Sequence, residues 1–120
     1  MIHHVTIEVS DLEASAEFYD AVFSPLGWRR HSDSGRGIGW GISQPWFFIS
    51  HGDTPVPGSE VVCFSAPGIA AVKGAWEGGI ETGGLDDGRP GQRTELGPSY
   101  YSAHLRDPDG HRIEIAVAPE

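Results

Sequence analysis

Hydrophobic and polar residues alternate along residues 2–9, at the start of the chain. The apolar residues on one side of this segment are Val5, Ile7 and Val9. The polar residues between them are His4, Thr6 and Glu8. Successive side chains of a β-strand point to opposite faces of the sheet. The pattern therefore predicts a strand with one buried face and one polar face.

A helix is predicted directly after this strand. Ser10 followed three residues later by Glu13 matches a capping box, in which each residue satisfies a free backbone N–H of the first turn. Apolar residues then recur three and four positions apart as far as Leu26, which places them along one side of a helix. Gly27 is typical of a helix C-terminus. We interpret the apolar side as core packing.

The remaining segments repeat this order. Short strands are predicted over residues 28–31, 37–42 and 46–50, separated by glycine-rich and polar turns. The second half gives a strand at 60–65, a helix at 69–76 and two strands at 100–105 and 112–117. Asp-Pro-Asp-Gly at 107–110 is strong turn chemistry and predicts a hairpin between the last two strands. Residues 83–98, rich in glycine and proline, are predicted as a mobile loop.

These elements predict a single α+β domain over residues 1–120, built from two βαβββ modules. The first module spans residues 1–52 and the second spans 59–118. Each sheet is expected to bury one face under its helix and to leave the other polar. Together the sheets would form a curved mixed sheet around a cleft, which is where a functional site is expected.

Composition narrows the class of partner. The net charge is −9, which argues against binding to nucleic acid or to an anionic membrane, because both require basic patches. The sequence has no apolar run of roughly 18 residues and no signal-peptide pattern at its start. Its single cysteine, Cys63, cannot form an internal disulfide. We therefore expect a cytoplasmic protein that binds a small molecule.

Several motifs together resemble those of the vicinal oxygen chelate superfamily, which includes glyoxalase I, extradiol dioxygenases and bleomycin-resistance proteins. They are His-Val-Thr-Ile-Glu-Val-Ser-Asp-Leu at 4–12, Phe-Tyr at 18–19, Leu-Gly-Trp at 26–28 and Asp-Pro-Asp-Gly-His-Arg-Ile-Glu at 107–114. The resemblance runs in the same order over essentially the whole chain and implies the fold above. Relatives often complete their clefts by pairing modules between subunits, so the resemblance also implies a homodimer.

The resemblance further implies a divalent metal ion, held by the first and last strands of each module. His4 matches the first ligand, Glu60 the third and Glu114 the last, whereas Phe48 occupies the remaining position and cannot bind a metal. One histidine and two carboxylates suit Mg²⁺, Mn²⁺ or Fe²⁺, with Ni²⁺ and Zn²⁺ as further candidates. Strand alternation places the three predicted ligands on polar faces, with Cys63 on the helix-covered face.

Further residues are predicted to line the cleft. His104 is a candidate general acid or base and Tyr100 a candidate hydrogen-bond donor. The alternatives for His104 are a fourth metal ligand or a hydrogen-bonded partner of Glu114 or Tyr100. A flat ligand could stack in a pocket lined by four aromatic residues, which are Trp40, Trp46, Phe48 and Phe64; the alternative is that they are core. Arg112 either binds a substrate carboxylate or pairs with Glu8.

Two functional hypotheses follow. The first is a metal-dependent enzyme of the glyoxalase type, a lyase or isomerase in which the metal stabilises an enolate. The second is a metal-free binding protein of the bleomycin-resistance type, which the aromatic content and Phe48 favour and whose negative charge would suit a cationic drug. An extradiol dioxygenase fits less well, because the predicted ligands reverse its set of two histidines and one carboxylate.

Overall fold

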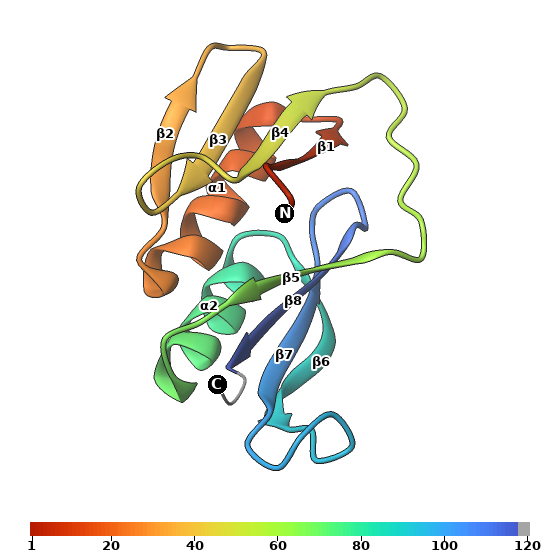
Figure 1. The fold of residues 1–120 in the computed structure, drawn as a ribbon. Helices are drawn as coiled ribbons and strands as arrows, with labels where there is room; N and C mark the ends of the chain where they lie inside the picture. Colours follow the sequence, from red (N-terminus) through yellow and green to blue (C-terminus); the bar gives the residue numbers. More distant parts are fainter. Residues whose placement is uncertain (118–120) are drawn as a thin grey trace.

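The computed structural model describes residues 1–117 and contains two modules with the same order of elements (Figure 1). The first module consists of β1 (Val5–Val9), α1 (Leu12–Phe23), a short 3₁₀ helix (Ser24–Leu26), β2 (Arg29–Asp33), β3 (Gly37–Gly41) and β4 (Phe47–His51). The second consists of β5 (Val61–Ser65), α2 (Ile69–Glu81), β6 (Leu85–Gln92), β7 (Tyr101–Arg106) and β8 (Arg112–Val117). The predicted α+β architecture of two βαβββ modules is confirmed.

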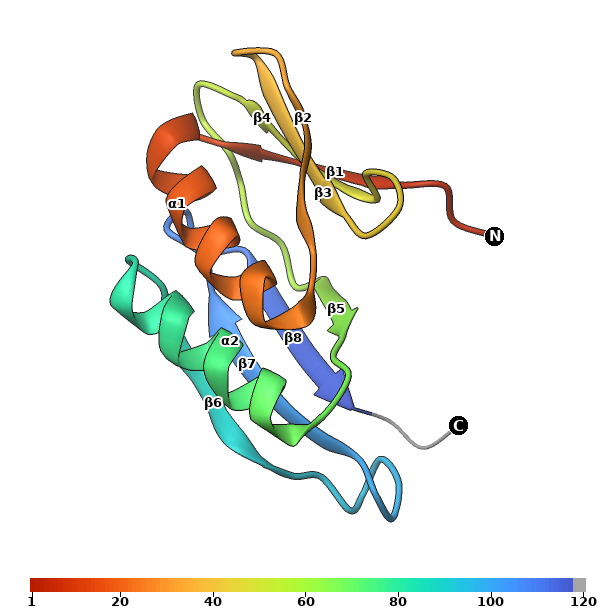
Figure 2. The same ribbon diagram turned by 90° about the vertical axis from the view of Figure 1, so that its left-hand side faces the viewer.

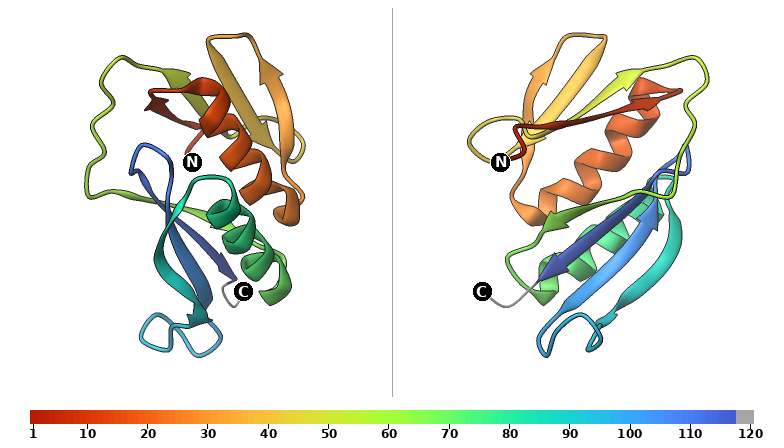
Figure 3. Two further views of the ribbon diagram at one scale, coloured as in Figure 1. Left: turned by 180° about the vertical axis from the view of Figure 1, so that it is seen from behind. Right: turned by 45° about the vertical axis from the view of Figure 1, so that its right-hand side comes forward.

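Each module contributes one four-stranded mixed sheet. The strand order is β1-β4-β3-β2 in the first sheet and β5-β8-β7-β6 in the second. In both, the first strand of the module pairs in parallel with the last, and the other pairs are antiparallel. Among the described residues no ladder joins the two sheets, so β1 and β5 are both edge strands at the seam between the modules (Figure 3).

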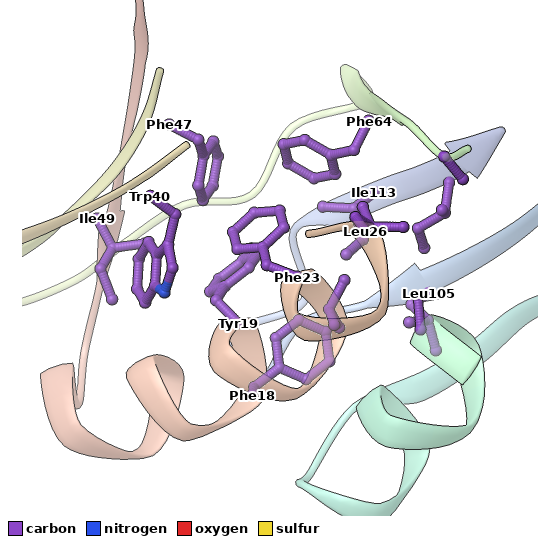
Figure 4. Close-up of a cluster of buried hydrophobic side chains, with 14 of the residues drawn as sticks. Phe18, Tyr19, Phe23, Leu26, Trp40, Phe47, Ile49, Phe64, Leu105 and Ile113 are labelled. Atoms are coloured by element: carbon purple, nitrogen blue, oxygen red, sulfur yellow. The ribbon is translucent and has the colours of Figure 1, made fainter. Parts of the chain in front are cut away.

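The helices lie side by side along one side of the molecule (Figure 2). Their apolar faces and the helix-facing residues of both sheets form one continuous core. The ring of Phe64 from β5 meets Phe23 of α1 at 4.8 Å and Phe47 of β4 at 5.1 Å between centroids (Figure 4). Such edge-to-face contacts add to the free energy gained by burial. The aromatic contacts therefore hold the modules together.

Hydrogen bonds at the β7–β8 turn also join the modules. The buried carboxylate of Asp107 accepts a hydrogen bond from the Tyr19 hydroxyl of α1 at 2.8 Å and from the backbone N–H groups of Asp109 and His111 at 3.0 and 2.9 Å. Burial raises the pKa of Asp107, and it also raises the pKa of Tyr19, together with the neighbouring Asp107 charge. Ser10 adds two hydrogen bonds to the Asp109 carboxylate. The predicted turn is thus also an inter-module contact.

Three local predictions are corrected. Asp11, not Ser10, caps α1 by accepting a hydrogen bond from the backbone N–H of Ala14, because the Ser10 hydroxyl is bound to Asp109. Helix α2 continues to Glu81, beyond the predicted end at residue 76. The segment predicted as a loop at 83–98 contains strand β6, which pairs with β7 through register shifts at its glycines. Within residues 1–117, no helix is long and apolar enough to span a membrane.

Candidate ligand-binding site

The second sheet has one face packed under α2 and one face without a covering helix, which we call the open face (Figure 3, right). Strand alternation sends Ile113, Ile115 and Leu105 into the core. The intervening residues of β8 and β7 therefore point to the open face. Glu114 and His104 stand directly opposite each other in the antiparallel register there.

The carboxylate of Glu114 is the centre of a polar cluster on this face. The Tyr100 hydroxyl donates a hydrogen bond to Glu114 Oε2 at 3.1 Å. His104 Nε2 lies 3.6 Å from the same oxygen, which is too long for a hydrogen bond but close enough for an ion pair when the imidazole is protonated. The side chains of His104 and Glu114 are only 23% and 12% exposed, respectively. The structure thus brings together Tyr100, His104 and Glu114, three of the predicted site residues.

Cys63 also belongs to this cluster, which corrects its predicted place in the core. Its partner in the parallel β5–β8 register is Glu114, and the residue is exposed, whereas Phe64 next to it is buried. Partial burial and the Glu114 charge raise the pKa of the Cys63 thiol to about 11, so the thiol is protonated at neutral pH. Desolvation and the Cys63 and Glu114 charges likewise raise the pKa of Tyr100, which remains a hydrogen-bond donor.

A second charged group lies two residues further along the same strands. Arg112 donates from Nε to Asp87 Oδ2 at 3.0 Å, and Arg106 Nε lies 3.6 Å from Asp87 Oδ1. Arg106 and Arg112 are directly opposite each other in the β7–β8 register. Arg112 therefore pairs with Asp87 and not with Glu8, the partner considered from the sequence.

The open face of the first sheet carries an aromatic side chain, Phe48, beside the polar residues Thr6 and Glu8 of β1. His4 lies just before β1, with its ring 5.3 Å from that of Phe48 in an edge-to-face contact. Its Nδ1 lies 2.8 Å from Nδ1 of His3. Phe48 is half-buried and stands beside Thr6 in the β1–β4 register. This face therefore offers an aromatic wall next to one imidazole.

Glu60 does not occupy the predicted position. It precedes β5 and is exposed. Because Phe64 is buried and Val62 packs against the core, the alternation puts Val61 and Cys63 on the open face. The residue of β5 that corresponds to His4 of the first module is thus Val61, an aliphatic residue that cannot bind a metal.

The donor set of one chain does not fit a three-ligand metal site. Within residues 1–117, no three His, Cys, Asp or Glu side chains are grouped closely enough to hold a metal ion. His4 and Glu114 lie on the open faces of different sheets, and Glu60 is on neither. Phe48 occupies the remaining ligand position of the resemblance, and Val61, not Glu60, occupies the place on β5 that corresponds to His4.

The four aromatic residues predicted to line a pocket divide into two groups. Trp40 is 0% exposed and donates from Nε1 to Asp20, so it belongs to the core. Phe64 is 3% exposed and is mainly a core residue, although it borders a cavity of about 600 Å³ at the seam between the modules. Trp46 lines this cavity with His4. Trp46 and Phe48 are half-buried, so they remain accessible for stacking against a ligand.

Comparison with known proteins agrees with this fold. The family model described as "Glyoxalase/Bleomycin resistance protein/Dioxygenase superfamily" matches residues 1–115. The chain belongs to this superfamily. The resemblance drawn from the sequence motifs is therefore confirmed.

Individual relatives of this superfamily member cover nearly its whole length. It is 30% identical to Virulence protein STM3117 of Salmonella typhimurium, over 96% of this chain and 82% of that protein. A glyoxalase/bleomycin resistance protein from Albidiferax ferrireducens has a TM-score of 0.86 at 30% identity, with 98% of each chain covered. A fosfomycin resistance protein, FosX from Listeria monocytogenes, whose structure contains Mn(II), shares the fold with a TM-score of 0.73 at 20% identity, covering 99% of this chain and 90% of that chain.

Sequence reasoning missed two residues of the open face of this superfamily member. Asp87 was placed in a loop, because a segment containing Gly88, Pro90 and Gly91 has no strand-like alternation. Arg106 was also missed, although it lies on the same face of β7 as His104, which was predicted as a site residue. The alternation of side chains along β7 would have placed Arg106 on the same face as His104.

Proposed function

We propose that this protein binds a small organic molecule on the open faces of its sheets without a resident metal ion. The observation that carries the proposal is the contrast between those faces. The second sheet offers the Glu114 cluster, with Tyr100 as a donor and His104 as a neighbouring imidazole. The first sheet offers Phe48, an apolar surface for stacking. Ligand sites are typically apolar with a few placed polar groups.

The same contrast argues against the metal-dependent hypothesis. A catalytic zinc ion is held by three protein ligands. Phe48 and Val61 supply none. The residues present are therefore better suited to hydrogen bonding and stacking than to metal coordination.

We further propose that the complete cleft forms between two copies of the chain. The helix-facing sides of both sheets contribute to one core, so their open faces lie outside it. Neither Glu114 nor Phe48 lines the cavity at the seam within one chain. Pairing two copies would set the open face of the first sheet opposite the open face of the second, with two equivalent clefts per dimer.

An acid–base enzyme is the second candidate, and one observation favours it. His104 and Glu114 form a partly buried pair with their nearest atoms 3.6 Å apart. An imidazole next to a carboxylate can accept a proton from a bound substrate and return it elsewhere. In this case His104 would be the base and Glu114 would stabilise the imidazolium that forms. Chemical conversion of the ligand during incubation would establish this function, provided that His104→Gln binds the ligand with the wild-type affinity but does not convert it.

The first experiment measures bound metal and oligomeric state together. Protein purified without a histidine tag or chelator is analysed for its elements and titrated with Mn²⁺, Ni²⁺, Fe²⁺ and Zn²⁺, and its mass in solution is determined by light scattering. We expect a dimer without stoichiometric metal. Close to one equivalent of metal per chain, lost in both His4→Ala and Glu114→Ala but retained in the control His51→Ala, would overturn the metal-free proposal. His51 is a suitable control because it is exposed at the end of β4.

A further inference from the structure

Two arginines stand directly opposite each other on the open face of the second sheet. Arg106 of β7 and Arg112 of β8 are register partners, and both contact the single carboxylate of Asp87. Like charges at directly opposed positions destabilise a sheet unless a counter-charge lies between them. One carboxylate offsets only one of the two guanidinium charges. Among the described residues, Asp87 is the carboxylate within ion-pair distance of the two arginines, so one guanidinium charge has no ion-pair partner of its own.

The hydrogen bonds of these arginines leave donors free. Arg112 contacts Asp87 through Nε alone, at 3.0 Å. Its two terminal nitrogens form no hydrogen bond with any of the described residues, and they are the pair that binds a carboxylate or phosphate in bidentate fashion. Arg106 uses Nε towards Asp87 and Nη1 towards the carbonyl of Gly110, at 3.3 Å, so its Nη2 has no partner among residues 1–117. Three guanidinium nitrogens are thus available to a ligand.

Asp87 is held in place by an irregularity of β6. The β6–β7 register shifts between Asp86 and Gly88, which is where Asp87 lies. Such a bulge redirects a side chain relative to a regular strand. The N–H of Gly88 donates to the Asp86 carboxylate at 2.9 Å, which stabilises the local turn of the backbone. Asp87 can therefore reach Arg112 across the intervening strand β7 and orient it.

We propose that Arg106 and Arg112, positioned by Asp87, form an anion subsite for one carboxylate or phosphate group of the ligand. The inference rests on the proposed ligand-binding function and adds the chemical class of the ligand. The arginine pair lies two residues along β7 and β8 from His104 and Glu114 on the same face, which separates their backbone positions by about 6–7 Å at the rise of a β-strand. Glu114 is a hydrogen-bond acceptor. The matching ligand is a small organic acid with a hydrogen-bond donor about 6–7 Å from its anionic group.

The test uses the full-length protein, labelled with ¹⁵N, and inorganic phosphate as the probe. Phosphate should shift the amide resonances of β7 and β8 next to the arginines. Arg112→Gln should weaken phosphate binding about tenfold, because charge-assisted bidentate hydrogen bonds are lost. Arg112→Lys keeps the charge but loses the fork, and should weaken binding by a smaller factor. Arg89→Gln is the matched control, since it removes one positive charge from the neighbouring strand β6 and should change affinity less than about twofold.

A second measurement tests the role of Asp87 and remains informative if an arginine variant fails to fold. Asp87→Asn leaves the two guanidinium groups without their shared counter-charge, so its melting temperature should fall and phosphate should raise it more than it raises that of the wild type. Asp86→Asn, which removes the same charge one residue away, should gain no more from phosphate than the wild type does. Equal phosphate binding by the wild type, Arg112→Gln and Arg89→Gln would overturn the proposal. Because the subsite lies within one sheet, a monomeric or metal-containing protein would refute the proposed function without affecting this result.

To define the rest of the ligand, the same titration is made with 5-hydroxypentanoate and with pentanoate. The hydroxyl group of the first lies at the far end of the chain from its carboxylate, where it would meet Glu114. Tighter binding of 5-hydroxypentanoate, with the advantage lost in Glu114→Ala but kept in the control Asp53→Ala, is the expected result. Equal affinity for the two acids would overturn the assignment of Glu114 as the second pole of the ligand site.

Discussion

The carboxylate of Asp107 should contribute more to stability than any other single polar side chain of the β7–β8 turn. It is 1% exposed and accepts three hydrogen bonds, one from Tyr19 and two from the turn backbone. At about 1 kcal/mol per hydrogen bond, Asp107→Ala loses about 3 kcal/mol, and the buried Tyr19 hydroxyl left without a partner adds about 1 kcal/mol. Removing a carboxylate whose pKa is raised by burial offsets part of this loss. We expect a net decrease of about 3 kcal/mol in the free energy of unfolding.

The assay is urea denaturation followed by circular dichroism at neutral pH. Tyr19→Phe should lower the free energy of unfolding by about 1–2 kcal/mol, because it leaves one Asp107 oxygen unpaired. In the double variant the two losses should not add, with a coupling energy of about 1 kcal/mol or more. Asp53→Ala, at an exposed position in the linker between the modules, is the control and should change stability by less than about 0.5 kcal/mol. A loss below about 1 kcal/mol for Asp107→Ala, or strict additivity with Tyr19→Phe, would refute the reasoning.

Other perturbations test packing, thiol chemistry and charge. A Cβ atom on Gly79 would lie 2.6 Å from Cδ1 of Leu105, so Gly79→Ala should lower the free energy of unfolding in urea by about 1–2 kcal/mol; a stabilised variant would contradict this. Burial and the Glu114 charge raise the pKa of Cys63 to about 11, so Glu114→Gln should speed its alkylation by iodoacetamide at pH 8, and an unchanged rate by mass spectrometry would count against the contact. Desolvation alone would raise the pKa of Asp20, but hydrogen bonds from an arginine and a tryptophan outweigh it and lower this pKa overall. This carboxylate therefore stabilises the fold above its unfolded pKa of about 4 and loses that contribution as the pH falls. Asp20→Asn should reduce the pH dependence of the free energy of unfolding, measured in urea between about pH 5 and pH 2. An unchanged pH dependence would contradict this prediction.

The fold could be predicted because its signals are local and repeated. The alternation in β1 and the Asp-Pro-Asp-Gly turn each depend on a few neighbouring residues, and the structure has both where they were expected. The helix limits were less certain because caps depend on tertiary contacts. Ser10 matches a capping box by sequence, yet its hydroxyl binds Asp109, which is 99 residues away along the chain. A rule based on neighbouring residues in the sequence cannot account for this hydrogen bond to a distant residue.

Half of the site was harder to predict, because a one-residue error in register reverses the face of a strand. Placing Glu60 on the polar face of β5 required Cys63 to be in the core, and both assignments were wrong together. Two valines, Val61 and Val62, stand side by side at the start of this strand, so its hydrophobic pattern does not fix the phase. In β7 and β8 the strict alternation around His104 and Glu114 does fix it. Asp87 could not be predicted from the sequence, because a bulged strand has no regular alternation of apolar and polar residues.

The two modules share a topology but differ in what they present, and this difference bears on the kind of ligand. Thr6 and Phe48 are neighbours in the β1–β4 ladder, and the corresponding neighbours in the β5–β8 ladder are Cys63 and Glu114. The first module therefore has an aromatic ring where the second has a carboxylate. A dimer that paired like modules would produce one cleft with two aromatic walls and another with two carboxylates facing each other, which would repel. Pairing unlike modules gives two identical clefts, each with one apolar and one polar wall, and avoids placing the Glu114 carboxylates together. An amphipathic ligand, with a flat or aliphatic side against Phe48 and polar groups towards Glu114, is the kind that such a cleft would select.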